Sequence, residues 1–242
     1  MSSEASVHCI GLIGGMSWES TAVYYRRINE RVRDLLGGLH SADIILRSVD
    51  FDRITRMQKA GEWGLAEDEM SSIAIQLERA GAEVVLICTN TMHLTADAVQ
   101  SAIGKPLLHI ADVTGEAIAA AGVKRPLLLA TRYTMEHAFY RSRLSALFGV
   151  DTMVPDEDDR GTVHEIIFDE LCKGVIRDDS RRKYQAIINR ALAAGADSVI
   201  LGCTEIGLLI GETDVECPVF DTTMLHADAA VDYVLRQPSA GH

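Results

Sequence analysis

The stretch AGAEVVLICTNTM, residues 80–92, has a second copy in AGADSVILGCTEI, residues 194–206. The two copies align without a gap at an offset of 114 residues, the difference between positions 194 and 80. In each copy a glycine, typical of a helix end, precedes a run of Val, Ile and Leu that is typical of a buried strand. The repeat predicts that one helix-to-strand unit occurs twice in the chain.

Apolar runs of strand length alternate with segments of helical periodicity along the whole chain. Residues 70–81 and 181–195 are helix-like and end in glycine; the strand-like runs are residues 8–14, 42–51, 82–89, 106–110, 125–131, 196–204 and 217–220. This alternation predicts an α/β fold of parallel sheets with helices on both faces. A weaker match of residues 11–28 with residues 127–144 supports two pseudo-symmetric lobes. We place them at residues 1–100 with 215–242, and at residues 101–214.

The composition argues against several classes of function. The net charge is −12 and Lys and Arg form no cluster, which disfavours nucleic acid and anionic membranes as partners. No apolar run reaches the roughly 18 residues of a membrane span, and the first residues lack a signal-peptide pattern. The five cysteines are scattered without CxxC spacing, so neither a metal site nor a disulfide framework is indicated. We expect a cytoplasmic protein with reduced thiols.

The alignment of the two copies separates two neighbouring candidates for chemistry, Cys88 and Thr89. It pairs Thr89 with Cys203 and Cys88 with Gly202. Neighbouring side chains along a strand point to opposite faces, so Cys88 is expected to be buried. Ligands of parallel sheets bind beyond the carboxyl ends of strands, where Thr89 and Cys203 are expected. A thiol can serve as a general base, whereas a threonine hydroxyl can donate or relay a proton or hold a water.

Several motifs together resemble the aspartate/glutamate racemase family. They are IGLIGGMSWESTAVYYRRIN, TNTMH, ELCKG, GADSVILGCTEIGLLI and DTTMLHADAAV, and they run in the family's order from residue 10 to about residue 231. The resemblance implies two α/β lobes with the active site in the cleft between them, usually in a homodimer. It also implies proton removal from the amino-acid α-carbon by one cysteine and its return by a second, without pyridoxal phosphate or any other cofactor.

The chain departs from the family at the first of these cysteines. The usual motif Cys-Asn-Thr-x-His here begins with Thr89, whereas the second motif keeps Cys203. This pairing resembles a branch of bacterial broad-specificity or L-specific aspartate/glutamate racemases. It implies a bias toward L-substrates, with Cys203 as base and Thr89 or water on the opposite face. The alternatives are a decarboxylase or cis–trans isomerase that uses the single cysteine, and a non-catalytic amino-acid-binding protein.

Other residues are expected to hold the substrate. Hydrogen bonds to the ammonium and α-carboxylate groups are expected from Asn90, Thr91, Thr131 and Thr204, and Thr134 could either join them or cap the following helix. The resemblance adds Met16 and Gln58, the latter otherwise a polar helix residue. For the distal carboxylate it indicates Lys173, with Arg47 as a second candidate; either could instead be a solvated surface charge.

Glycines and histidines complete the set of candidates. Gly11, Gly14 and Gly15 lie between a strand and a helix that Ser17 is expected to cap, which indicates either an anion-binding turn or simply a tight one. The spacing is not the dinucleotide fingerprint. His93 and His226 follow family motifs, and a structural role is expected for each. Glu205 stands where glutamate racemases carry a histidine.

Overall fold

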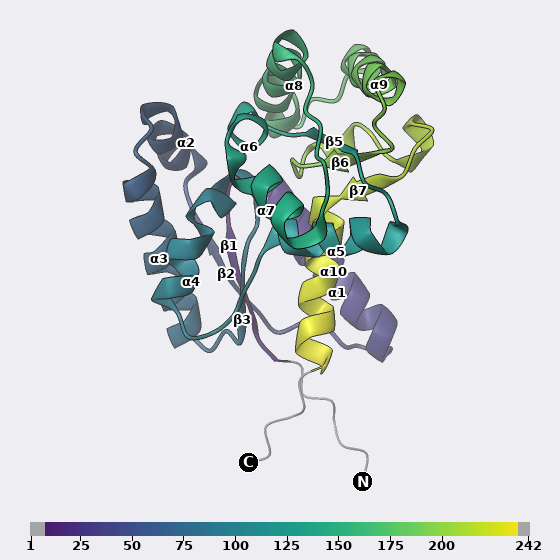
Figure 1. The fold of residues 1–242 in the computed structure, drawn as a ribbon. Coiled ribbons are helices and arrows are strands. Elements are labelled where there is room, and N and C mark those ends of the chain that lie inside the picture. Colours follow the sequence, from purple (N-terminus) through teal and green to yellow (C-terminus); the bar gives the residue numbers. More distant parts are fainter. Residues whose placement is uncertain (1–7, 237–242) are drawn as a thin grey trace. The chain divides into compact units, whose positions relative to one another are not determined.

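The computed structural model describes residues 8–236, and its strands form two parallel sheets (Figure 1). The first sheet has the order β2-β1-β3-β4 and the second β5-β6-β7. The strands are β1 (Ile10–Gly14), β2 (Ile44–Ser48), β3 (Val84–Ile87), β4 (Leu107–Leu108), β5 (Pro126–Leu129), β6 (Ser198–Leu201) and β7 (Val219–Asp221). Six of these strands fall within the predicted runs, β7 extends one residue beyond its run of residues 217–220, and the predicted α/β class is confirmed.

Helices fill most of the segments between these strands. The α-helices are α1 (Trp18–Leu36), α2 (Phe51–Ala60), α3 (Trp63–Arg79), α4 (Ala96–Ala102), α5 (Ile110–Ala121), α6 (Arg132–Glu136), α7 (Ala138–Phe148), α8 (Glu157–Asp169), α9 (Asp178–Ala193) and α10 (Thr222–Arg236). Short 3-10 turns are η1 (Thr91–Thr95), η2 (Leu171–Lys173), η3 (Ile206–Leu208) and η4 (Glu212–Asp214). None of the helices in the described part of the chain is long and apolar enough to cross a membrane.

The chain divides into two compact units, and the first holds the four-stranded sheet. Its described residues are 8–88, 95–109 and 226–236. One sheet face, with Ile10, Leu12 and Leu86, is buried in a single apolar cluster with side chains of α1 and α10. Gly11 faces α3 on the other side, where an added Cβ would lie 3.2 Å from the Cβ of Leu77. Helices therefore cover both faces of this sheet, as predicted.

Helices α1 and α10 are also joined by polar contacts within the first unit. Arg27 donates two hydrogen bonds to Asp228, each 2.6 Å long. The Tyr24 hydroxyl lies 2.9 Å from Nδ1 of the fully buried His226. The last helix is thus fixed to the first one by charge as well as by apolar packing.

The second unit, residues 89–94 and 110–225, is built on the three-stranded sheet. The strands β5 and β6 are buried along their whole length, as expected for a sheet covered on both faces. Figure 1 shows α5 and α7 on one side of this sheet and α8 and α9 on the other. Side chains from these helices and from β5 and β6 share one core cluster.

The internal repeat is confirmed at the level of backbone hydrogen bonds. The N–H of Cys88 donates to Ile13 O at 2.9 Å, and the N–H of Gly202 donates to Leu129 O at 2.7 Å. The two copies therefore pair with their neighbouring strands in the same register. Since Cys88 and Gly202 occupy equivalent places, Thr89 and Cys203 are equivalent as well.

Candidate active site

Cys203 lies two residues beyond β6, and its thiol contacts a carboxylate. The residue is 9% exposed, and its thiol donates a hydrogen bond of 2.9 Å to Oε2 of Glu205. The hydroxyl of Thr204 donates to the same oxygen at 2.7 Å. Burial raises the pKa of the Cys203 thiol well above its usual value, and the negative charge of Glu205 acts in the same direction. The thiol is therefore neutral in this arrangement and acts as a hydrogen-bond donor.

The segment that carries Thr89 is held by a histidine. The N–H of Ile110 donates to Nε2 of His93 at 3.1 Å, so the ring proton is on Nδ1 and is donated to the carbonyl of Thr89 at 2.8 Å. His93 is buried, whereas Thr89 is half-buried. The expected structural role of His93 is confirmed, and its contact fixes the backbone from which the Thr89 side chain projects.

Asn90 connects this segment to the strand that precedes Cys203. Its side-chain N–H donates to the hydroxyl of Thr222 at 2.9 Å, and that hydroxyl donates to Leu201 O at 2.8 Å. Because the single hydroxyl proton of Thr222 is already used, the side-chain amide of Asn90 can only be the donor. Its Oδ1 is buried and has no hydrogen-bond partner among the described residues. Asn90 therefore offers one unused acceptor next to Thr89.

Three buried threonine hydroxyls form a small cluster in the second unit. Oγ1 of Thr91 lies 2.9 Å from Oγ1 of Thr131 and 3.0 Å from Oγ1 of Thr134. Thr131 is also the N-cap of α6, because its hydroxyl accepts from the N–H of Thr134. The expectation that Thr134 caps this helix is thus wrong, since Thr134 lies inside it. The structure brings together three of the predicted substrate-binding residues.

Cys88 lies in the apolar core, as expected. It is fully buried in the cluster formed by β1, β3, α1 and α10. Burial raises the pKa of the Cys88 thiol far above its usual value. A thiolate at this position would lack both solvent and a charge partner.

Replacing Cys88 with alanine is expected to lower the free energy of unfolding by about 1 kcal/mol, because it removes one buried atom from the core. Catalytic turnover is expected to stay within about twofold of the wild-type value, because the thiol does no chemistry. Denaturant unfolding and steady-state kinetics measure the two quantities. A large loss of turnover in a stably folded Cys88→Ala protein would contradict this placement.

The expectation that Gly11, Gly14 and Gly15 all lie between the strand and the helix is wrong, because Gly11 and Gly14 belong to β1 and only Gly15 lies in the tight turn after it. Gly15 has a φ of +90°, and its N–H donates to the hydroxyl of Thr21 at 2.8 Å. Ser17 is the N-cap of α1, as predicted. The Gly15 N–H is therefore engaged by the helix itself, which favours the tight-turn interpretation at this position.

The remaining predicted binding residues are divided between the two units. In the first unit Met16 and Gln58 are buried, whereas Arg47 is exposed and donates to Ser48 O at 3.2 Å. In the second unit Lys173 is exposed and pairs with Asp169 at 3.2 Å, one helical turn away. Lys173 contacts none of the residues around Cys203 through any hydrogen bond or ion pair seen in residues 8–236.

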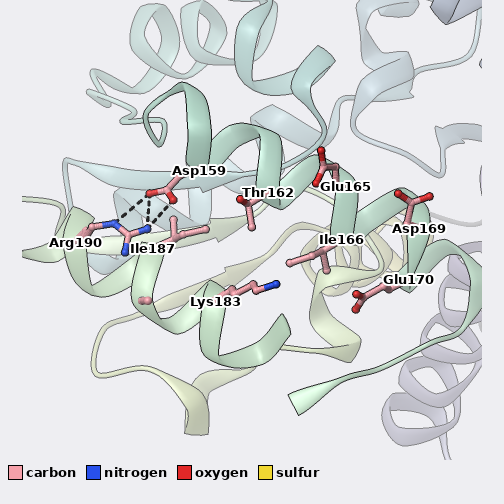
Figure 2. Close-up of a pocket in the computed structure, with 10 residues that line it drawn as sticks. Asp159, Thr162, Glu165, Ile166, Asp169, Glu170, Lys183, Ile187 and Arg190 are labelled. Carbon is pink, nitrogen blue, oxygen red and sulfur yellow. Dashed lines mark hydrogen bonds and ion pairs between the residues drawn. The ribbon is translucent and has the colours of Figure 1, made fainter. Parts of the chain in front are cut away.

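The second unit has a hollow of about 450 Å³ between α8 and α9 (Figure 2). Its lining includes Asp159, Glu165, Lys183 and Arg190, and Arg190 forms an ion pair with Asp159 at 2.6 Å. None of the predicted site residues lines it. Residues 8–236 contain no group of three or more His, Cys, Asp or Glu side chains that could hold a metal ion.

Two features of the site were not predicted from the sequence. Thr222, which connects Asn90 to Leu201, was not chosen although it stands in the DTT motif directly after β7. Glu205 was noted only for the histidine that it replaces, and the contact with Cys203 was not anticipated. The motif position was an available signal for Thr222. No feature of the sequence predicts that the side chain of Glu205 contacts another residue of its own loop.

Comparisons with known proteins agree with this geometry. The model of the Asp/Glu/hydantoin racemase family matches residues 13–230. The chain is 22% identical over 237 residues to the broad specificity amino-acid racemase RacX of Bacillus subtilis (strain 168), over 95% of this chain and 100% of that protein.

Solved structures give the same result. A candidate Asp/Glu racemase from Yersinia pestis is 52% identical with a TM-score of 0.89, over 95% of this chain and 100% of that one. An aspartate racemase homologue from Pyrococcus horikoshii OT3 is 32% identical with a TM-score of 0.82, over 94% and 99% of the two chains. An unliganded arylmalonate decarboxylase, 17% identical with a TM-score of 0.52, shares only the fold.

Proposed function

Because the chain belongs to the Asp/Glu/hydantoin racemase family, we propose that it racemises an acidic amino acid, aspartate or glutamate, without a cofactor. Cys203 is the base in this proposal, and Thr89 or a water serves the opposite face of the α-carbon. The supporting observation is the equivalence of Thr89 and Cys203 in the two repeat copies, each just beyond its strand, while Cys88 is buried in the core.

The chemistry follows from the two different side chains. A Cys203 thiolate would remove the α-proton of an L-amino acid, and the electron pair of the C–H bond would pass into the carbanion and its carboxylate. A threonine hydroxyl is not a base near neutral pH, so Thr89 can only deliver or relay the proton to the other face. Exchange of the substrate α-hydrogen is therefore expected to be faster with L-substrates than with D-substrates.

Substrate binding is proposed for the polar groups around these two residues. The unused Oδ1 of Asn90 would accept a hydrogen bond from the substrate ammonium. Thr91, Thr131 and Thr134, with Thr204, would serve the α-carboxylate. The residues proposed for the distal end of the substrate are Lys173, Arg47, Gln58 and Met16.

The test is incubation of the protein with each enantiomer of aspartate and glutamate in heavy water. Uptake of deuterium at the α-carbon and the enantiomer composition are followed together. We expect exchange and inversion with at least one L-enantiomer, and slower exchange with its D-counterpart. Equal rates from both enantiomers would contradict the bias. No exchange with any of the four would reject racemisation of these substrates and favour decarboxylase, isomerase or binding activity.

A further inference from the structure

The carboxylate of Glu205 is held against the candidate base. Glu205 is 3% exposed, and its Oε2 accepts hydrogen bonds from both the Cys203 thiol and the Thr204 hydroxyl. The thiol and this oxygen are 2.9 Å apart, which is within the distance of direct proton transfer. A buried carboxylate in contact with a buried thiol is an arrangement in which two acidic groups compete for one proton.

The replacement of the first cysteine by Thr89 gives this contact a chemical purpose, if the proposed function holds. After each inversion of an L-substrate, Cys203 carries the proton that it removed. On the opposite face of the substrate, Thr89 stands in place of a second thiol. No second thiol there gains and loses a proton in step with Cys203. Cys203 must lose its proton before the next L-substrate can react, and its thiol is in hydrogen-bond contact with the carboxylate of Glu205.

We propose that Cys203 and Glu205 share one proton, and that Glu205 takes up the proton that Cys203 removes from the substrate. The thiol S–H bond breaks and its electron pair stays on sulfur, while an O–H bond forms on the carboxylate. Glu205 then passes this proton to solvent, and the proton delivered to the opposite face comes from solvent through Thr89 or water. Glu205 acts through Cys203 and is therefore a positioning residue.

The charged groups near the Cys203 thiol determine the effect expected when the Glu205 carboxylate is removed. The other titratable groups whose charges act in this region are Cys172 on η2, Tyr184 on α9 and Glu170, the residue before η2. The hydroxyl of Tyr184 donates to Val163 O, and burial keeps its pKa well above the usual value, so it stays neutral. Glu205 is the negative charge in contact with the thiol. Its replacement by glutamine keeps the size of the side chain but removes that charge and the acceptor for a proton.

The first arm of the test is the ionisation of Cys203. The rate of its alkylation by iodoacetamide is measured from about pH 6 to about pH 11 by mass spectrometry of the Cys203 peptide. Without the neighbouring negative charge the thiolate forms more easily, so in Glu205→Gln the midpoint should move about one pH unit or more toward acid. The matched control is Glu212→Gln, because Glu212 is an exposed glutamate of the same unit. Its midpoint should not move.

The second arm is turnover of L-substrate by the same proteins. Despite its easier ionisation, Glu205→Gln should lose about a hundredfold in kcat with KM nearly unchanged, because the proton acceptor is gone. Glu205→Asp keeps a carboxylate and should recover about tenfold of that loss. Thermal unfolding of every variant identifies any that fail to fold, and Glu205→Asp then serves as the second test protein.

The two arms separate the possible errors. An alkylation midpoint that does not move overturns the shared proton, whether or not the chain racemises these amino acids. A shifted midpoint with unchanged or faster turnover overturns the role of proton acceptor and leaves only an electrostatic effect. If wild-type protein shows no exchange with any of the four amino acids, the proposed function fails and the role of proton acceptor fails with it. The alkylation midpoint then tests only whether Cys203 and Glu205 share a proton.

Discussion

Replacing Cys203 with serine is expected to lower exchange of the substrate α-hydrogen by about a thousandfold or more, because a hydroxyl cannot be ionised near neutral pH as a thiol can. Serine keeps the shape and hydrogen-bonding capacity of the residue, so its bond to Glu205 can still form. Deuterium uptake from heavy water, measured in a single long incubation, reports the residual rate.

The matched control for this substitution is Cys217→Ala. Cys217 is a partly buried free cysteine of the same unit and has no part in the proposed chemistry. We expect exchange within about twofold of the wild-type rate in this variant. Persistence of fast exchange in Cys203→Ser would show that another group is the base.

Replacing Gly15 with alanine is expected to destabilise the protein by about 3 kcal/mol or more, because two separate costs add. Its φ of +90° is unfavourable for any residue with a Cβ. In addition, the new Cβ would lie 2.5 Å from the backbone N of Val49 and still closer to Val49 O, and backbone atoms cannot easily move aside. We expect a fall of roughly 6–12 °C in the midpoint of thermal unfolding.

The control for Gly15 is Gly61→Ala, which separates these two costs. Gly61 also has a positive φ, +69°, but nothing lies within 4 Å of the place where its Cβ would be. This variant should lose only about 1 kcal/mol, the conformational part alone. Equal losses in the two variants would show that the turn relaxes around the added Cβ.

The fold was largely predictable because its signals are local. A parallel strand that is buried on both faces needs a run of apolar residues, and each strand in residues 8–236 lies in or overlaps such a run. The repeat also predicted the register of the equivalent strands, since an alignment without gaps already decides which of Cys88 and Thr89 is equivalent to Cys203. Ser17 was found for a similar reason, because a helix cap is a relation between residues three positions apart.

The candidate site was less predictable because its decisive relations are between distant residues or depend on rotamers. The bond from Asn90 to Thr222 joins positions 132 residues apart and follows from the order of strands in space. Thr131 and Thr134 have the same side chain, and only the exact start of α6 decides which of them is the cap. The contact between Cys203 and Glu205 depends on the direction in which one glutamate turns.

The joining of α1 to α10 has a consequence for how the chain is made. One face of the first sheet, with Ile10, Leu12 and Leu86, reaches its native burial only when residues of α10 pack against it. Everything from Ile110 to Asp221 is translated in between, which takes about ten seconds at ordinary rates of synthesis. During that interval α1 can pack on this face but the part that α10 covers stays open, so the first unit to be synthesised is completed last.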